Sequence, residues 1–257
     1  MTTSISKSVA RAFEVLECFR DARTPFSATE LRKRLGHPHS SVVAVLKNLT
    51  EIGYLSYDSI KRTYFPTQKL QRLGTWVQTA LLGTSGFQDL ADAVSLATNE
   101  TASLITRSFI FNHIFYVKRS EHPLAHHLPV GIGITLCNSV VGRVVLSQMT
   151  DAEIERIYKY SVHWSRSQHT EAMRPFDEIE KAVNSVRKNG YLIGYDVWLK
   201  GIGAVAYALK APFDGFPLAV SVSGPTARIK TMEKSIRKSV ERCLSLAASS
   251  GKPGKAA

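Results

Sequence analysis

The sequence predicts an α+β fold in which a small winged helix-turn-helix domain precedes a larger α+β domain. Residues 27–65 contain two short helix patterns followed by an aromatic-rich hairpin, and the rest of the chain alternates helical and strand patterns. The chain has 257 residues and a formal net charge of +12. Its first 84 residues hold 12 Lys and Arg against six Asp and Glu, which is half of that net charge. This concentration of positive charge favours an anionic partner such as nucleic acid.

The first helix of the pair is predicted from its two ends. Ser27 and Glu30 have the spacing of a capping box, in which the hydroxyl and the carboxylate each satisfy an unpaired backbone donor. Gly36 is the residue type that commonly ends a helix, and Pro38 suits the first turn of a new one. Apolar residues at helical spacing over residues 9–19 predict a further helix that braces the pair.

The second helix of the pair is the candidate recognition helix. Val42, Val45, Leu46 and Leu49 recur at helical spacing and predict a buried stripe. The remaining surface is small or polar, so it can lie in the major groove without desolvating a carboxylate. The candidate DNA-binding residues of this helix are His39, Ser40, Ser41, Ala44, Lys47 and Asn48.

The hairpin after this helix is the predicted wing. Strand-forming residues at 54–57 and 63–65 flank a polar turn, and that turn ends in Lys61 and Arg62. We expect these two cations to contact phosphates or the minor groove, although a charged hairpin tip in isolation is more often only solvated.

The later elements complete an expected division into domains. We assign residues 1–67 to the winged helix-turn-helix domain, 68–86 to a linker helix, 87–250 to an α+β effector-binding domain and 251–257 to a disordered tail. Helices are expected at 90–98, 140–149, 151–160, 176–189 and 225–248, and strands at 101–109, 111–118, 192–197, 203–211 and 217–222. The linker helix has an apolar stripe that is a candidate dimer seam, formed by Leu70, Leu73, Val77 and Leu81 with Trp76 beside it.

Other patterns argue against metal, cofactor and catalytic sites. Cys18, Cys137 and Cys243 are isolated, which fits neither a zinc site nor a disulfide framework, and we expect a soluble protein of the reducing cytoplasm. No apolar run reaches the roughly 18 residues of a membrane-spanning helix. The spacing of His122 and His126, with His127 adjacent, resembles a metal motif but includes Pro123. We therefore expect no metal, cofactor or catalytic residue, and we interpret Cys137 as a buried apolar residue.

Several local motifs resemble those of the IclR-type bacterial transcriptional regulators. The Ser-Gly-Pro-Thr-Ala-Arg run at 223–228 resembles the family's strand-to-helix junction, and Ser-Val-Val-Gly-Arg at 139–143 resembles its Thr-Ala-Leu-Gly-Lys helix start. Asn-Glu-Thr at 99–101, Tyr-Val at 116–117, Gly-Tyr at 190–191 and Gly-Ile at 201–202 resemble further family motifs. The resemblance covers nearly the whole chain and implies a DNA-binding repressor or activator with a GAF-like effector domain.

The resemblance also implies where an effector binds. It indicates a pocket formed by Leu128, Asn138, Ser139, Val140, Asp196, Trp198, Ala204, Ser221 and Ser223. A helix that begins near Ser139 presents free backbone donors, which suits a carboxylate. We therefore expect a small organic acid, with an aromatic acid slightly favoured. Tyr195, Trp198 and Tyr207 are either apolar walls of this pocket or ordinary core residues.

Two departures from the family pattern affect these expectations. Val43 and Ala44 follow Ser-Ser-Val where the family often has His-Arg, so a bidentate contact from Arg to guanine cannot form there. Asp196 is the only acidic residue between Tyr191 and Gly201, where the family usually has several. We expect an altered ligand pocket.

The alternatives to a ligand-responsive regulator are a nucleic-acid-binding protein without a ligand and an enzyme that uses the C-terminal domain. The enzyme lacks a supporting motif such as G-x-S-x-G, a Walker loop or H-E-x-x-H. A regulator would act as a homodimer or homotetramer on a pseudopalindromic double-stranded operator.

Overall fold

The computed structural model describes residues 6–82, 86–123, 134–168, 173–210 and 217–249, and of residues 76–82 and 168 it describes the backbone alone. The chain divides into two compact units, Met1–Thr79 and Ala80–Ala257. The division falls inside the helix predicted as a linker, α4 at Gln68–Leu82. Of the predicted stripe on this helix, Leu70 is half-buried and Leu73 is exposed. The side chains of Trp76, Val77 and Leu81, and the tail at 251–257, lie outside the described residues.

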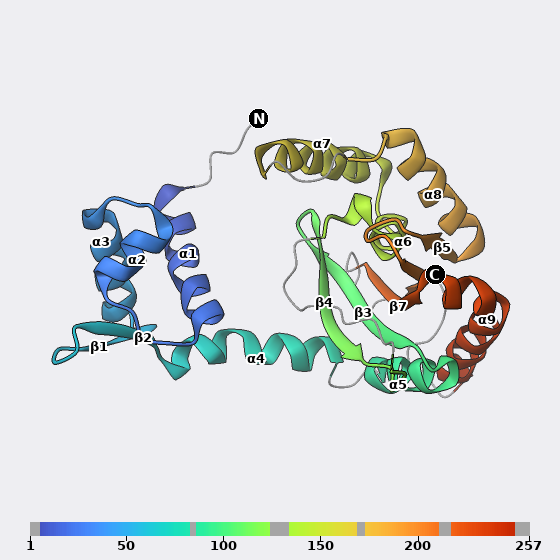
Figure 1. Ribbon diagram of the computed structural model, residues 1–257, viewed down its shortest axis with the longest axis horizontal. Helices are drawn as coiled ribbons and strands as arrows, with labels where there is room; N and C mark the ends of the chain where they lie inside the picture. Colours follow the sequence, from blue (N-terminus) through green and yellow to red (C-terminus); the bar gives the residue numbers. More distant parts are fainter. Residues whose placement is uncertain (1–5, 83–85, 124–133, 169–172, 211–216, 250–257) are drawn as a thin grey trace. The chain divides into compact units, whose positions relative to one another are not determined.

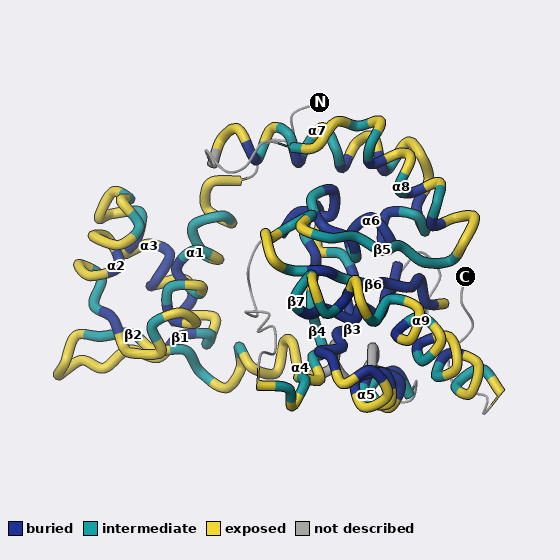
Figure 2. Tube along the Cα trace, turned by 45° about the vertical axis from the view of Figure 1, so that its right-hand side comes forward, coloured by how far each residue is buried: buried dark blue, intermediate teal, exposed yellow. Residues whose placement is uncertain are grey.

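The N-terminal unit is a winged helix-turn-helix (Figure 1). It consists of α1 Lys7–Ala22, α2 Ala28–Leu35, α3 His39–Glu51 and the strands β1 Leu55–Asp58 and β2 Thr63–Pro66. The three helices enclose a separate core that includes Phe19, Leu31 and Leu46. Figure 2 shows that the buried side of these helices faces inward, whereas most of the hairpin is exposed.

The predicted helix boundaries in this unit are formed by local hydrogen bonds. The Ser27 backbone N–H donates to the Glu30 carboxylate over 2.7 Å, and the Glu30 N–H donates to Ser27 Oγ over 3.3 Å. Gly36 ends α2 in the left-handed region with φ of 68°, where a side chain would be strained. The structure begins α3 at His39 and makes Pro38 its N-cap, one position before the predicted first turn.

The C-terminal unit is built on an antiparallel five-stranded sheet with the order β4-β3-β7-β6-β5. Its elements are α5 Phe87–Thr98, β3 Thr101–Ser108, β4 Phe111–Lys118, η1 Leu136–Asn138, α6 Val140–Leu146, α7 Asp151–Gln168, α8 Phe176–Asn189, β5 Tyr191–Tyr195, β6 Ile202–Leu209, β7 Leu218–Pro225 and α9 Thr226–Ser249. Compared with the sequence prediction, α6 ends three residues earlier, α7 extends eight residues further, and Pro225 ends β7 instead of opening α9.

Helices cover both faces of this sheet (Figure 1). One face packs against α5 and α9 and carries large residues such as Leu104, Val205 and Val222. The other face packs against α6 and α8 and carries several alanines, among them Ala206 and Ala219. Small residues on this face let α6 approach the strands closely. None of the described helices is long and apolar enough to cross a membrane.

Candidate functional site

The outer surface of α3 lies opposite its buried stripe, and its exposed residues are small or polar except for Val43. Of the eight candidate DNA-binding residues, His39, Ser40, Ala44, Lys47, Asn48, Lys61 and Arg62 are exposed. Val43, which the sequence analysis did not include, is also exposed on α3. The Lys47 ammonium lies 3.9 Å from the Glu51 carboxylate, and both side chains are largely exposed. Such a pair is weak and leaves the ammonium available to a phosphate.

Ser41 differs from its neighbours because it is half-buried and contacts another helix. Arg11 Nη1 on α1 donates a hydrogen bond to Ser41 Oγ over 3.2 Å. Ser41 therefore takes part in the contact between α1 and α3. Sequence reasoning missed Arg11 because it lies 30 residues away along the chain.

The tip of the wing has a defined shape. Asp58 Oδ1 accepts hydrogen bonds from the backbone N–H groups of Ile60 and Lys61 at 2.9 and 3.0 Å. These bonds, led by the one from Lys61, hold the pKa of Asp58 below its ordinary value. Arg62 is in the left-handed region with φ of 53°. The turn thus presents Ile60, which is 93% exposed, together with the two predicted cations.

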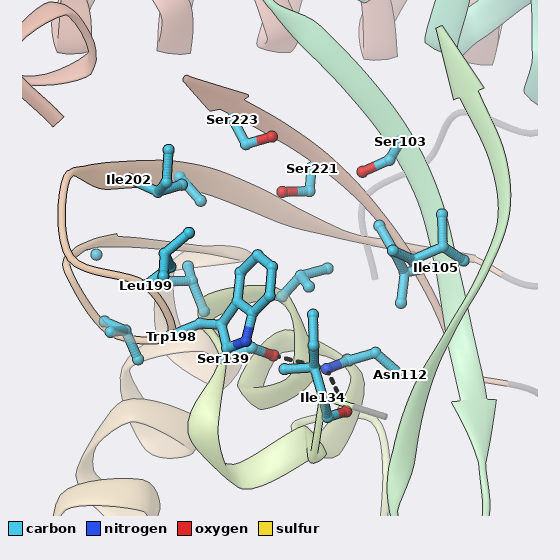
Figure 3. Close-up of a pocket in the computed structure, with 16 residues that line it drawn as sticks. Ser103, Ile105, Asn112, Ile134, Ser139, Trp198, Leu199, Ile202, Ser221 and Ser223 are labelled. Carbon is cyan, nitrogen blue, oxygen red and sulfur yellow. Dashed lines mark hydrogen bonds between the residues drawn. The ribbon is translucent and has the colours of Figure 1, made fainter. Parts of the chain in front are cut away.

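The C-terminal unit contains a pocket between the sheet and the start of α6 (Figure 3). The space between its walls, including the part open to solvent, is about 550 Å³. Its sheet side is formed by β3, β4, β6 and β7, and its other side by α6 and the segment after β5. The lining residues are Ser103, Ile105, Asn112, Ile114, Ile134, Ser139, Val140, Val141, Gly194, Val197, Trp198, Leu199, Ile202, Ala204, Ser221 and Ser223. None of them carries a formal charge.

A hydrogen-bond network fixes the wall at the start of α6. Ser139 is the N-cap of this helix, and its Oγ accepts from the Gly142 N–H over 2.9 Å. The Asn112 side-chain amide donates to the same Oγ over 2.9 Å and to the Ile134 carbonyl over 3.1 Å. The amide nitrogen also donates to the Thr135 carbonyl over 3.3 Å, and because two of its three partners are carbonyl oxygens, which only accept, the Asn112 amide is oriented with its nitrogen toward them.

The structure brings six of the nine predicted effector residues together. Ser139, Val140, Trp198, Ala204, Ser221 and Ser223 all line the pocket. Asn138 and Asp196 lie outside its lining, and Leu128 lies outside the described residues. Asn138 Oδ1 accepts from the Arg174 N–H over 3.4 Å, while Asp196 Oδ1 accepts from the Gly201 N–H over 2.6 Å and from Thr226 Oγ1 over 2.9 Å. These hydrogen bonds lower the pKa of Asp196 and use its carboxylate to shape a turn.

Of the two alternatives for Tyr195 and Tyr207, the structure confirms that they are core residues and not pocket walls. Both pack with the core on the α5 and α9 face of the sheet, away from the pocket. The Tyr195 hydroxyl donates to Glu233 over 2.5 Å, and burial together with this carboxylate raises the pKa of Tyr195 to about 12. Alternation along β5 and β6 places them on that face, whereas Trp198 follows β5 and lines the pocket.

Sequence reasoning missed the polar residues contributed by β3 and β4. Ser103 pairs in register with Ser221, and Asn112 meets Ser139, which lies 27 residues later. Strand alternation was visible in the sequence, but the order β4-β3-β7 was not. A polar residue at an inward position of a buried strand is the signal that could have identified Ser103.

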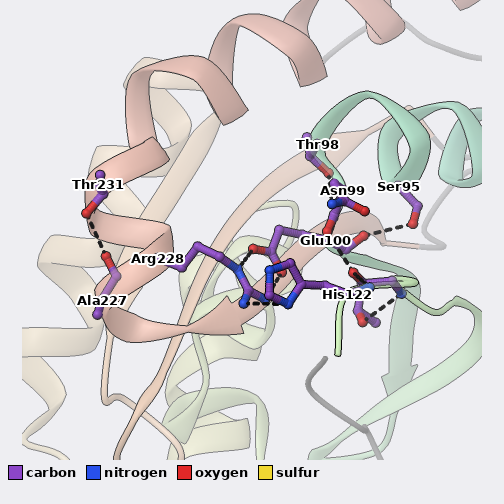
Figure 4. Close-up of polar contacts among 10 residues, drawn as sticks. Ser95, Thr98, Asn99, Glu100, His122, Ala227, Arg228 and Thr231 are labelled. Atoms are coloured by element: carbon purple, nitrogen blue, oxygen red, sulfur yellow. Dashed lines mark hydrogen bonds and ion pairs between the residues drawn. The ribbon is translucent and has the colours of Figure 1, made fainter. Parts of the chain in front are cut away.

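A second polar cluster lies at the junction of α5, β3 and α9 (Figure 4). The Glu100 carboxylate is 1% exposed and accepts from Arg228 Nε and, over 2.8 Å, from Arg228 Nη2. Arg228 Nη1 lies 3.2 Å from His122 Nδ1. Because Arg228 neutralises a buried carboxylate, we assign this cluster a structural role.

The remaining candidate groups offer no reactive or metal-binding arrangement in the described part of the chain. No group of three or more His, Cys, Asp or Glu that could hold a metal occurs among the described residues, and His126 and His127 fall outside them. Cys137 is buried in the core beneath α6, and burial raises its pKa to about 11. A thiol in this state is a poor nucleophile at neutral pH.

Comparisons with known proteins agree with this architecture. The Pca regulon regulatory protein of Pseudomonas putida is 23% identical over 230 residues, which cover 88% of this chain and 77% of that protein. The HTH-type transcriptional regulator XynR of Escherichia coli (strain K12) is 22% identical over 231 residues, which cover 89% and 90%.

Solved structures extend the agreement to the fold. An IclR family transcriptional regulator from Brucella abortus aligns with a TM-score of 0.68 at 19% identity, covering 97% of this chain and 94% of that one. Residues 8–59 match the IclR helix-turn-helix domain, and residues 85–249 match the family described as "Bacterial transcriptional regulator IclR C-terminal". The chain therefore belongs to the IclR family of bacterial transcriptional regulators.

Proposed function

We propose that this regulator binds a pseudopalindromic double-stranded operator through α3 and the wing, and that a small organic acid in the C-terminal pocket changes this binding. The observation that carries the proposal is the exposed face of α3. It combines His39, Ser40 and Asn48 with the available ammonium of Lys47 and has no carboxylate of its own until Glu51.

Base recognition by this face differs from recognition through arginine. Ala44 is exposed on α3 and contributes a methyl group that suits contact with thymine. Asn48 has the donor and acceptor geometry to pair with adenine. Lys61 and Arg62 flank this helix from the wing and supply contacts to phosphates or the minor groove. Ser41 accepts a hydrogen bond from Arg11, which holds α3 against α1. We propose that Ser41 also contacts DNA, at the edge of the surface formed by α3.

The pocket supports a small ligand that is largely apolar. Ile105, Trp198 and Leu199 line it, and several hydroxyl groups supply hydrogen bonds. A carboxylate would be held by serine hydroxyls, because no cationic side chain lines the pocket among the described residues. The flat apolar wall of Trp198 favours an aromatic acid.

A homo-oligomer with a two-fold axis would match the two-fold symmetry of a pseudopalindromic operator. Two copies related by a two-fold axis contact two half-sites whose centres are separated by a whole number of helical turns, each about 34–36 Å. We propose a homodimer, or a homotetramer formed from two such dimers.

Titration of the full chain against the DNA that flanks its own gene tests the proposal. Fluorescence anisotropy at two salt concentrations, with unrelated DNA as competitor, should show saturable binding that survives the competitor. The same complex is then titrated with millimolar short-chain and aromatic acids. Binding that the competitor abolishes would contradict operator recognition. Operator binding that no acid alters would favour a nucleic-acid-binding protein without a ligand.

A further inference from the structure

Two fully enclosed polar atoms in the pocket lack a hydrogen-bond partner among the described residues, and two further serine hydroxyls line the pocket beside them. Asn112 Oδ1 and Ser223 Oγ are fully enclosed and unpaired. Ser103 and Ser221 also line the pocket, and neither side chain makes a hydrogen bond within the described residues. All four residues are buried, with exposed fractions of 8% for Asn112, 5% for Ser223, 1% for Ser103 and 4% for Ser221.

Such a concentration of unpaired groups is unusual in a folded core. Buried polar groups are almost always hydrogen-bonded, because each loses its hydration on burial. Only three buried side-chain polar atoms are unpaired among the described residues, and two of these line this one pocket. The unpaired groups are therefore positions at which a bound molecule can supply the missing partners.

The two kinds of polar group lie at opposite ends of the pocket (Figure 3). The view shows Ser103, Ser221 and Ser223 together on the strands, and Asn112 beside Ser139 at the start of α6. The apolar side chains of Ile105, Trp198 and Leu199 lie between these ends. We call the first group the serine end and the second the asparagine end.

The asparagine end accepts hydrogen bonds. The Asn112 amide nitrogen is already engaged with Ser139 Oγ and the Ile134 carbonyl, so the group left over is the carbonyl oxygen Oδ1. A partner for it must donate a proton, which an ionised carboxylate cannot do. A ligand ammonium has three donors, and this end offers it one unpaired acceptor and no carboxylate among the described lining residues. A neutral hydroxyl meets the requirement.

The serine end can donate hydrogen bonds. A hydroxyl is both donor and acceptor, and three of them on the neighbouring strands β3 and β7 can converge on one group. A carboxylate has two oxygens with about four acceptor positions, and it can take all three. Hydrogen bonds to a charged acceptor are stronger than those between neutral groups.

We propose that the pocket takes a hydroxy acid whose hydroxyl donates to Asn112 Oδ1 and whose carboxylate accepts from Ser103, Ser221 and Ser223 across an apolar middle. This inference rests on the proposed function, since it names the chemical class of the ligand for the same pocket. It also explains why two polar ends are separated by Ile105 and Trp198.

Matched ligands test the asparagine end without changing the protein. The full chain is titrated by calorimetry and thermal shift with 3- and 4-hydroxybenzoic acid, their methyl ethers, benzoic acid and aliphatic ω-hydroxy acids of similar length. At least one hydroxy acid should bind about tenfold more tightly than its methyl ether, because the ether cannot donate to Oδ1. Equal affinity of ether and hydroxy acid, or no binding by any hydroxy acid, would overturn the proposal.

Two substitutions test the serine end. Ser223→Ala and Ser221→Ala should each weaken binding of the best hydroxy acid about tenfold while leaving its alcohol analogue unaffected. Ser245→Ala on exposed α9 is the matched control and should change neither. Unchanged affinity for the acid in both pocket variants would refute the placement of the carboxylate.

The same ligands separate this inference from the proposed function. A hydroxy acid that binds as expected but leaves operator affinity unchanged would support the ligand class and contradict regulation through the pocket. Operator binding by a protein that ignores every hydroxy acid would retain the DNA-binding function and reject the ligand class.

Discussion

Ser139 connects three parts of the C-terminal unit through one oxygen atom. Its Oγ accepts from the first turn of α6 and from Asn112 on β4, and its side chain also lines the pocket. A helix that begins near Ser139 was predicted from the sequence, where residues 139–143 resemble a helix start of the family. The contact with Asn112 was not, because it depends on the packing of β4 against the segment around η1.

Ser223 allows a prediction about the free protein. Replacing it with Ala removes a buried hydroxyl that has no partner among the described residues. We expect Ser223→Ala to raise the free energy of unfolding of the ligand-free protein by about 1 kcal/mol, since the desolvation of that hydroxyl is no longer required. Thermal unfolding of both proteins measures this difference, and a less stable variant would show that the hydroxyl is satisfied in solution.

At the scale of elements, α6 depends on close approach to the preceding segment. A Cβ at Gly142 would lie 2.2 Å from the carbonyl oxygen and 2.5 Å from the Cα of Leu136, and backbone atoms cannot move aside as a flexible side chain can. Gly74 on α4 offers a contrast, because nothing lies within 4 Å of its Cβ position. A glycine-to-alanine change at Gly142 therefore tests the effect of steric conflict, whereas the same change at Gly74 tests only the helix propensity of the residue.

We expect Gly142→Ala to lower the free energy of unfolding by about 2–3 kcal/mol through this steric conflict. Gly74→Ala should be neutral or stabilising by up to about 1 kcal/mol, because alanine favours a helix more than glycine does. Urea unfolding of both variants provides the comparison. Equal stability of the two would mean that α6 can shift away from Leu136.

The cationic side chains of α3 and the wing should determine how strongly DNA affinity depends on salt. If Lys47, Lys61 and Arg62 contact phosphates, replacing each with Ala should reduce the slope of log affinity against log salt by about one, across all DNA sequences. Lys234→Ala on exposed α9 is the control and should leave the slope unchanged. The assignment fails if none of the three variants alters the slope.

At the scale of the whole molecule, the two units have separate cores. The core of the N-terminal unit is built from residues of α1, α2, α3 and the wing, whereas the core of the C-terminal unit lies on both sides of its sheet. Each core can therefore melt by itself.

We expect scanning calorimetry of the full chain to show two transitions. Gly142→Ala and a bound hydroxy acid should shift only the transition of the C-terminal unit, in opposite directions. The other transition should keep the same temperature in all samples, which would assign it to unfolding of the helix-turn-helix unit. A single transition that moves as a whole in each sample would show that the units unfold cooperatively.

The sequence by itself determined the helix-turn-helix, the wing, most helices and strands, and the family. These features are encoded locally, in a capping box at Ser27, in apolar periodicity along α3 and in short motifs, so each could be inferred without knowing what it packs against. Six of the predicted pocket residues lie together for the same reason, since they belong to motifs that resemble the family.

Only the tertiary structure decided which side chains meet across the sheet. The order β4-β3-β7-β6-β5 sets Ser103 beside Ser221, brings Asn112 to Ser139, and turns Tyr195 and Tyr207 to the opposite face from the pocket. Strand pairing over long sequence separations is fixed by burial on both faces at once, and no local pattern contains that information. The unpaired groups of the pocket, and with them the chemistry expected of its ligand, follow from this pairing.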